Sequence, residues 1–166
     1  LEKVSKGDYL NDIEETLYKR ICERFNKICE LAYKKDVKIL VDAEESWIQD
    51  AIDEIVLKMM IKFNKDKVVV FNTSQMYRHD RLNYLKTLHN KAIRNNFFLG
   101  IKLVRGAYIE KENKRAKKNN YLSPICRSKE LTDQNFNRIN GKFPMSLKRK
   151  HSLNFCTAYN KMLSLN

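Results

Sequence analysis

The chain has 166 residues, of which 43% are hydrophobic, and these values are typical of a single globular domain. It contains no long uncharged apolar run, so we expect no membrane-spanning helix. Its formal net charge of +13 would suit an anionic partner such as nucleic acid, an acidic membrane surface or phosphate groups.

The distribution of charge argues against a nucleic-acid partner. Residues 1–133 hold 27 Lys and Arg against 20 Asp and Glu, whereas residues 134–166 hold six Lys and Arg and no acid. A nucleic-acid surface should instead show a basic stripe on one folded element, with aromatic residues interleaved. No such stripe is recognisable, and we expect no nucleic acid to bind.

The four cysteines and three histidines show no metal-ligand spacing, so no metal site is predicted. Cys22 and Cys29 lie on one side of a predicted helix among apolar neighbours, which is typical of buried thiols in a reducing compartment. No signal peptide is recognisable. Because the chain begins at Leu1 and not at a methionine, a preceding segment stays an open alternative.

The first predicted element is an amphipathic helix that begins after Asn11 and ends near Lys35, before Asp36. Asn11 and Glu14 have the spacing of a capping box. Behind them, apolar residues recur at three- and four-residue steps, which predicts one buried face. These residues are Ile13, Leu17, Ile21, Phe25, Ile28 and Ala32.

Three apolar runs, at residues 37–41, 68–71 and 98–104, predict strands that are buried on both faces. They begin about 30 residues apart with a helical pattern between each pair, which is the rhythm of a parallel βαβ sheet. No Gly-x-Gly-x-x-Gly follows any of them, so the fingerprint of a Rossmann dinucleotide site is missing.

A helix is expected after each of these strands. The first begins at a second capping-box pattern, Ser46 with Gln49, and carries an apolar stripe as far as Phe63. The second covers residues 82–93. The third is strongly charged and covers residues 110–118.

The pattern favours the α/β class, as part of a (β/α)8 barrel of the TIM type. A whole barrel needs about 200–250 residues, so three strands, or four if the tail contributes one, cannot close it. We therefore predict an incomplete barrel of three to four β/α units after an N-terminal helix, in a domain covering residues 1–137. Residues 138–166 are expected to form an irregular basic tail with a weak helix over residues 155–163.

Polar residues stand where each strand ends, and barrels carry their chemistry at the carboxyl ends of the strands. These residues are Asp42, Glu44 and Glu45 after the first strand, Thr73, Ser74 and Gln75 after the second, and Arg105 and Tyr108 after the third. The acids could instead only stabilise a helix N-terminus, the middle group could be turn residues, and the arginine could be a surface residue.

Lys102 is harder to explain as a surface residue, because it alternates with Ile101 and Leu103 in a buried strand. An unpaired buried ammonium is costly, so we expect either a functional cation or an ion pair with a carboxylate such as Asp42. Gly106 would let the backbone approach a ligand closely. Together these residues predict a pocket for a ligand that is anionic or has a polar edge. They do not identify that ligand.

Three blocks resemble the proline dehydrogenase family. Residues 41–53, VDAEESWIQDAID, resemble its signature around an acidic strand end, and residues 71–77, FNTSQMY, resemble its next strand end. Residues 102–108, KLVRGAY, followed by Glu110-Lys111-Glu112, resemble its third block. The blocks occur in the family's order and spacing, so the resemblance is highly specific. It covers about residues 1–137, and YLSPI at 121–125 and Thr132-Asp133 extend it.

The resemblance implies an FAD-dependent enzyme that oxidises L-proline to 1-pyrroline-5-carboxylate and passes electrons to a quinone. It implies catalytic roles for Asp42, beside proline and flavin, and for Lys102, near the reactive edge of the flavin. Tyr108 would line the proline pocket. The implied FAD contacts are Ala43, Gln75, Arg105, Gly106 and Ala107. Many relatives have arginine at position 102 and lysine at position 105; the exchange seen here keeps both charges.

The chain also departs from the family pattern. An upstream lysine and an arginine pair near the end of the barrel, which hold the substrate carboxylate in the family, have no counterpart here, nor does a Thr-His segment that helps to bind FAD. We therefore expect a fragment with little or no activity alone.

The family implies cytoplasmic or inner-membrane-peripheral enzymes in bacteria and mitochondrial enzymes in eukaryotes. Two other functions stay open. One is a non-catalytic basic interaction protein built on a decayed barrel fragment, with residues 142–150 as its binding segment. The other is an unrelated barrel enzyme that holds a phosphate at Arg105 and Gly106.

Overall fold

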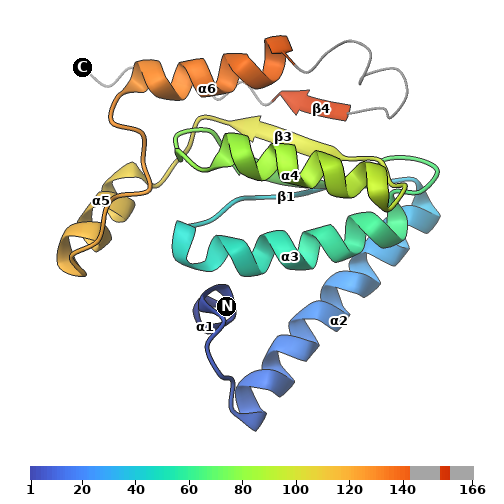
Figure 1. Ribbon diagram of the computed structural model, residues 1–166. Coiled ribbons are helices and arrows are strands. Elements are labelled where there is room, and N and C mark those ends of the chain that lie inside the picture. Colours follow the sequence, from blue (N-terminus) through green and yellow to red (C-terminus); the bar gives the residue numbers. More distant parts are fainter. Residues whose placement is uncertain (143–153, 158–166) are drawn as a thin grey trace.

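The computed structural model describes residues 1–142 and 154–157, which form one parallel sheet of four strands in the order β1-β2-β3-β4 with helices packed around it (Figure 1). The elements in chain order are α1 (Glu2–Lys6), α2 (Asp12–Lys35), β1 (Ile39–Val41), α3 (Ser46–Phe63), β2 (Val70–Gln75), α4 (Arg81–Arg94), β3 (Gly100–Val104), α5 (Ile109–Lys118), α6 (Lys129–Lys142) and β4 (Asn154–Thr157).

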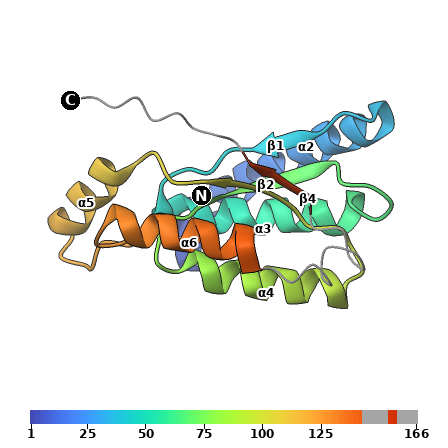
Figure 2. The same ribbon diagram turned by 90° about the horizontal axis from the view of Figure 1, so that it is seen from above.

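Helices α3, α4 and α6 lie against one face of the sheet (Figures 1 and 2). The strand residues on that face, Val70, Ile101 and Leu103, are fully buried against apolar residues of these helices, such as Met60 and Leu88. Burying one large apolar side chain contributes about 1.5–3 kcal/mol, so this layer stabilises the sheet and fixes which side chains point away from the helices.

The other face of the sheet corresponds to the interior of a closed barrel. Leu40 pairs with Phe71, and Thr73 pairs with Lys102, so these side chains share that face. Four strands cannot close a barrel, and Leu40 on the edge strand β1 is 42% exposed. The structure thus confirms an incomplete barrel, and a fourth strand, β4, comes from the segment expected to be irregular.

Helix α2 begins and ends as the sequence predicts. The side chain of Asn11 accepts a hydrogen bond from the Glu14 amide at 2.9 Å, the Asn11 amide donates to the Glu14 carboxylate at 3.0 Å, and Asp36 ends the helix in a left-handed conformation. The predicted buried face is wrong for most of its length, since Ile13, Leu17, Ile21 and Ile28 are all exposed. The helix begins well away from the sheet (Figure 1), and its buried residues, Cys29 and Ala32, lie near its end.

The capping box predicted at Ser46 is wrong. Glu45 is the N-cap, and Ser46 instead donates from its amide and its hydroxyl to Glu112, far along the chain. The second strand is also longer than predicted, because polar residues continue the ladder as far as Gln75. The Thr73 hydroxyl donates to the Val41 carbonyl at 2.6 Å, so its polar side chain has a partner inside the sheet.

The C-terminal part of the chain differs most from expectation. The prediction of irregular structure after residue 137 is wrong in two places. Residues 138–142 continue α6, and residues 154–157 form β4 beside β3. The helix expected at residues 155–163 is therefore wrong for 155–157, and its remainder lies outside the described residues. The proposed division between a barrel part and a divergent tail stays a prediction. Helix α1 was also not predicted.

Candidate functional site

Lys102 and Asp42 form an ion pair at the carboxyl ends of the strands. Lys102 lies in β3, where only 15% of its side chain is exposed, and Asp42 directly follows β1, two strands away, with 74% of its side chain exposed. The parallel sheet brings them together because all its strands end at the same edge. Pairing of the partly buried Lys102 with a carboxylate such as Asp42 was one of the two alternatives that the sequence left open, and it is the one that the structure shows.

Gln75, at the end of β2, connects the loops that follow β1 and β3. Its side-chain amide donates to the Glu44 carbonyl at 2.8 Å and accepts from the Ala107 amide at 3.1 Å. The residue is only 3% exposed. In this structure Gln75 therefore fixes the two loops that carry Ala43 and Ala107.

Tyr108 lies beside the same loop. Its hydroxyl donates to the Glu44 carboxylate at 3.0 Å, and burial together with this carboxylate raises the pKa of Tyr108. The phenol therefore stays protonated at neutral pH, and its ring is held in one place. The structure brings Asp42, Lys102 and Gln75 to the same edge of the sheet as Tyr108.

Arg105 and Gly106 form the other side of this edge. The Arg105 side chain donates to Asp133 at 2.6 Å, its guanidinium lies 4.8 Å from the centre of the Phe136 ring, and 38% of the side chain is exposed. Gly106 has φ 141°, and a Cβ atom there would collide with the ring of Tyr77. Only glycine is thus tolerated at this turn, through backbone conformation and close packing together.

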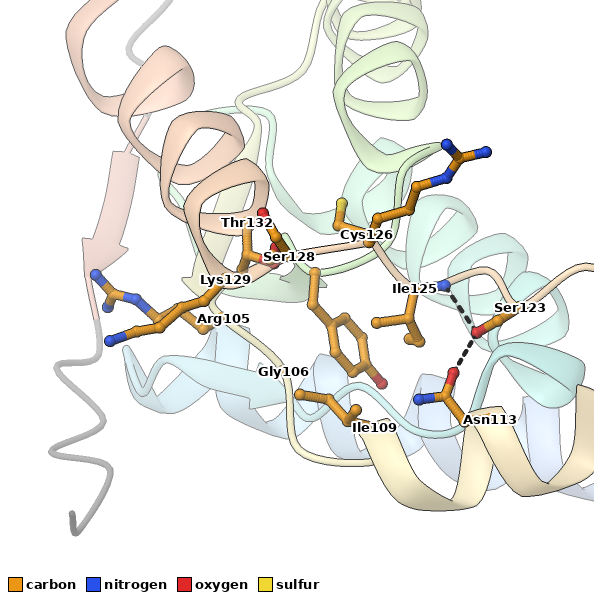
Figure 3. A pocket seen from close by; sticks show the side chains of 12 residues that line it. Arg105, Gly106, Ile109, Asn113, Ser123, Ile125, Cys126, Ser128, Lys129 and Thr132 are labelled. Atoms are coloured by element: carbon orange, nitrogen blue, oxygen red, sulfur yellow. Dashed lines mark hydrogen bonds between the residues drawn. The ribbon is translucent and has the colours of Figure 1, made fainter. Parts of the chain in front are cut away.

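A cavity of about 530 Å³ lies behind Gly106, between α5 and the beginning of α6 (Figure 3). Arg105 and Gly106 line it, but the other predicted site residues do not. Figure 3 shows Ile109 and Ile125 on its apolar side, and Thr132 of α6 opposite, with Ser128 just before that helix. Neither Asp42 nor Lys102 lines this cavity, so the cavity is separate from their ion pair.

A buried polar network supports the edge from the helix side of the sheet. Asp53 is 5% exposed and accepts hydrogen bonds from Gln49, Asn72 and Arg81, each at 2.8 Å. It joins α3, β2 and α4, so it fixes the position of β2 relative to both helices. The only sign of this network in the sequence is that Asp53 follows Gln49 by four residues, which places the carboxylate and the amide on one face of α3.

Within the part of the chain that the structure describes, no cluster of three or more His, Cys, Asp or Glu residues could hold a metal ion. Among the same residues, no helix combines the length and the apolar character needed to cross a membrane.

A family model described as "Proline dehydrogenase" matches residues 2–158. The chain belongs to the proline dehydrogenase family. The match includes the ends of β1, β2 and β3 and continues beyond residue 137, where the motifs recognisable in the sequence stop.

Curated proteins of this family show the same similarity. The chain is 42% identical over 125 residues to "Proline dehydrogenase 1, mitochondrial" of Drosophila melanogaster, which covers 75% of this chain and 18% of that protein. It is 37% identical over 128 residues to "Carbapenem antibiotics biosynthesis protein CarD" of Pectobacterium carotovorum, covering 77% of this chain and 33% of that protein. The chain thus spans between about a fifth and a third of these relatives.

Solved structures show the same fold. A crystal structure of a mutant of Proline Utilization A from Bradyrhizobium japonicum matches 86% of this chain and 15% of that protein, with a TM-score of 0.74 and 20% sequence identity. At this identity the likeness concerns the fold alone. It agrees with the strand order seen here, in which consecutive parallel strands are neighbours as in a barrel of the TIM type.

Proposed function

We propose that this chain carries part of the catalytic site of an FAD-dependent enzyme that oxidises L-proline to 1-pyrroline-5-carboxylate and passes the electrons to a quinone. The observation that carries the proposal is the Asp42–Lys102 ion pair at the carboxyl edge of the sheet. It places a partly buried cation where the barrel fold locates chemistry, in a chain that belongs to the proline dehydrogenase family.

The residues at this edge fit FAD in charge and in size. Lys102 and Arg105 place two positive charges at this edge, with 15% and 38% of their side chains exposed, and an anionic cofactor would share them with their carboxylate partners Asp42 and Asp133. Ala43 and Ala107 have small side chains, so the loops after β1 and β3 carry little bulk at this edge. When bound, FAD would supply the chemistry by accepting a hydride from the proline ring.

The protein side chains would bind and orient the reactants. Asp42 holds the Lys102 ammonium in place, so that its charge can stabilise an electron-rich ring at the edge of β3. Tyr108, fixed by its hydrogen bond to Glu44, would form one wall of the proline pocket. Gln75 keeps the loops after β1 and β3 at a constant separation, which fixes Ala43 relative to Ala107.

We propose that the chain alone binds FAD weakly and turns over little or no proline. The chain spans only 18% of the Drosophila relative. The family resemblance further implies that the sequence blocks which would hold the substrate carboxylate have no counterpart in this chain. Without these blocks, the chain would neither bind the proline carboxylate nor orient the substrate, even if it contacts the flavin.

The test is a titration of the 166-residue chain with FAD, followed by flavin fluorescence, for the wild type, Lys102→Met and Lys19→Met. Lys19 is an exposed lysine of α2, so its variant controls for the loss of one charge. We expect binding by the wild type and by Lys19→Met, and binding about tenfold weaker by Lys102→Met. Absence of FAD binding by the wild type would refute the proposal, and measurable turnover of proline with a quinone would refute the predicted inactivity.

A further inference from the structure

Helix α5 is docked mainly by polar contacts. Only Glu112 and Ala116 of this helix are buried, and most of its other residues are charged or polar and exposed. Figures 1 and 2 place it beyond the end of the sheet, beside the beginning of α3. A helix with so little apolar burial needs specific partners to keep its position.

One face of α5, together with its N-cap residue Tyr108, contacts four consecutive residues, 44–47, where the loop after β1 enters α3. The contacts are Tyr108 hydroxyl to Glu44 at 3.0 Å, Lys111 to Glu45 at 2.6 Å, Glu112 to the Ser46 amide at 2.5 Å and hydroxyl at 2.7 Å, and the Arg115 guanidinium to the Trp47 ring at 4.3 Å. Positions 108, 111, 112 and 115 share one side of a helix. The helix thus meets residues 44–47 in order, one side chain for each residue.

Glu112 is the central contact of this face. Helix α3 begins at Ser46, and its N-cap, Glu45, makes no capping hydrogen bond with its side chain. The Glu112 carboxylate is fully buried and accepts from both the amide and the hydroxyl of Ser46. A carboxylate at this place satisfies one of the free amides of a helix N-terminus and complements the helix dipole.

We propose that α5 is a clamp on residues 44–47 and that Glu112 is its positioning residue. By capping α3 from another helix, Glu112 fixes the loop that carries Asp42 and therefore the distance from Asp42 to Lys102. The consequence for flavin binding rests on the proposed function. The clamp itself is a property of the protein without any cofactor.

Substitution at Glu112 separates this role from a general contribution to stability. In Glu112→Ala, the Ser46 amide and hydroxyl lose their acceptor, so residues 44–48 should open locally. Glu112→Gln keeps the size of the side chain and one acceptor oxygen, and should restore part of the effect. Glu110→Ala, at an exposed position of the same helix, is the matched control.

The measurement is amide hydrogen exchange on the 166-residue chain without FAD, with the fluorescence of Trp47, its only tryptophan, as a second reporter. We expect exchange at residues 44–48 to become about tenfold faster in Glu112→Ala, with a smaller change in Glu112→Gln and none in Glu110→Ala. Amides of β2 should keep their wild-type rates, and the Trp47 emission should shift only in the Glu112 variants.

Two results would overturn the proposal: unchanged exchange at residues 44–48, or equal acceleration there and in β2, which would make Glu112 a general structural residue. If Glu112→Ala does not fold, Ser46→Ala, which removes only the hydroxyl donor, should still accelerate exchange at residues 44–48, and no acceleration would contradict the clamp. A parallel FAD titration should show weaker binding and an altered flavin absorbance in Glu112→Ala. A wild type that binds no FAD would instead refute only the proposed function.

Discussion

Asp80 lies between two arginine side chains at the beginning of α4. It accepts hydrogen bonds from Arg78 at 2.8 and 3.0 Å and from Arg81 at 3.1 Å. Burial opposes ionisation, but the hydrogen bonds and charges of both arginines lower the pKa of Asp80 to about 2. The carboxylate therefore stabilises the folded state at pH values above its ordinary pKa, and this contribution is lost as the pH falls toward 2.

We accordingly expect Asp80→Asn to lower the free energy of unfolding by about 1–2 kcal/mol at pH 6, since the 37% exposure of the side chain screens the interaction. The difference from the wild type should fall to about a third of this value at pH 2.5, because the folded-state pKa of Asp80 is about 2. Urea unfolding at both pH values measures this, with Asp8→Asn, an exposed aspartate, as the control. A deficit that is equal at both pH values would show that the charge of Asp80 is not its cause.

Helix α2 shows which features of an element are local. Its capping box joins residues three apart in the sequence, and the structure forms it as predicted. Replacing Asn11 with Ala removes the acceptor for the Glu14 amide, so we expect the free energy of unfolding to fall by about 1 kcal/mol. Thermal unfolding measures this change. Asn83→Ala, at an exposed position inside α4, should have no such cost, and an equal loss in both variants would contradict a capping effect.

Other features of the elements depend on residues far apart in the chain, and for that reason the sequence did not reveal them. Ser46 looks like the start of a capping box, but Glu112, 66 residues away, takes its hydrogen bonds. Likewise, the apolar stripe of α2 predicts a buried face, yet only a tertiary partner can bury it, and Ile13 is 72% exposed. The hydrophobic period and the capping residues predict where a helix lies in the sequence, whereas tertiary packing decides which of its side chains are buried.

At the scale of the whole molecule, the parallel arrangement could be predicted and the end of the chain could not. The regular spacing of the apolar runs implies a parallel sheet, and such a sheet necessarily brings Asp42, Gln75 and Lys102 to one edge. The candidate site was predictable for this reason. Strand β4 was not, because residues 154–157 are too few to show a period, and their place beside β3 depends on the finished sheet.

We propose that Asp42 and Lys102 act as one unit at a flavin site. A double-mutant cycle on the FAD affinity of the 166-residue chain, with Asp42→Asn, Lys102→Met and the two combined, tests it most directly. We predict that each single substitution weakens binding and that the double variant is little worse than Lys102→Met, which corresponds to a coupling free energy of at least about 0.5 kcal/mol. Strictly additive effects, or unchanged affinity in both single variants, would contradict the claim.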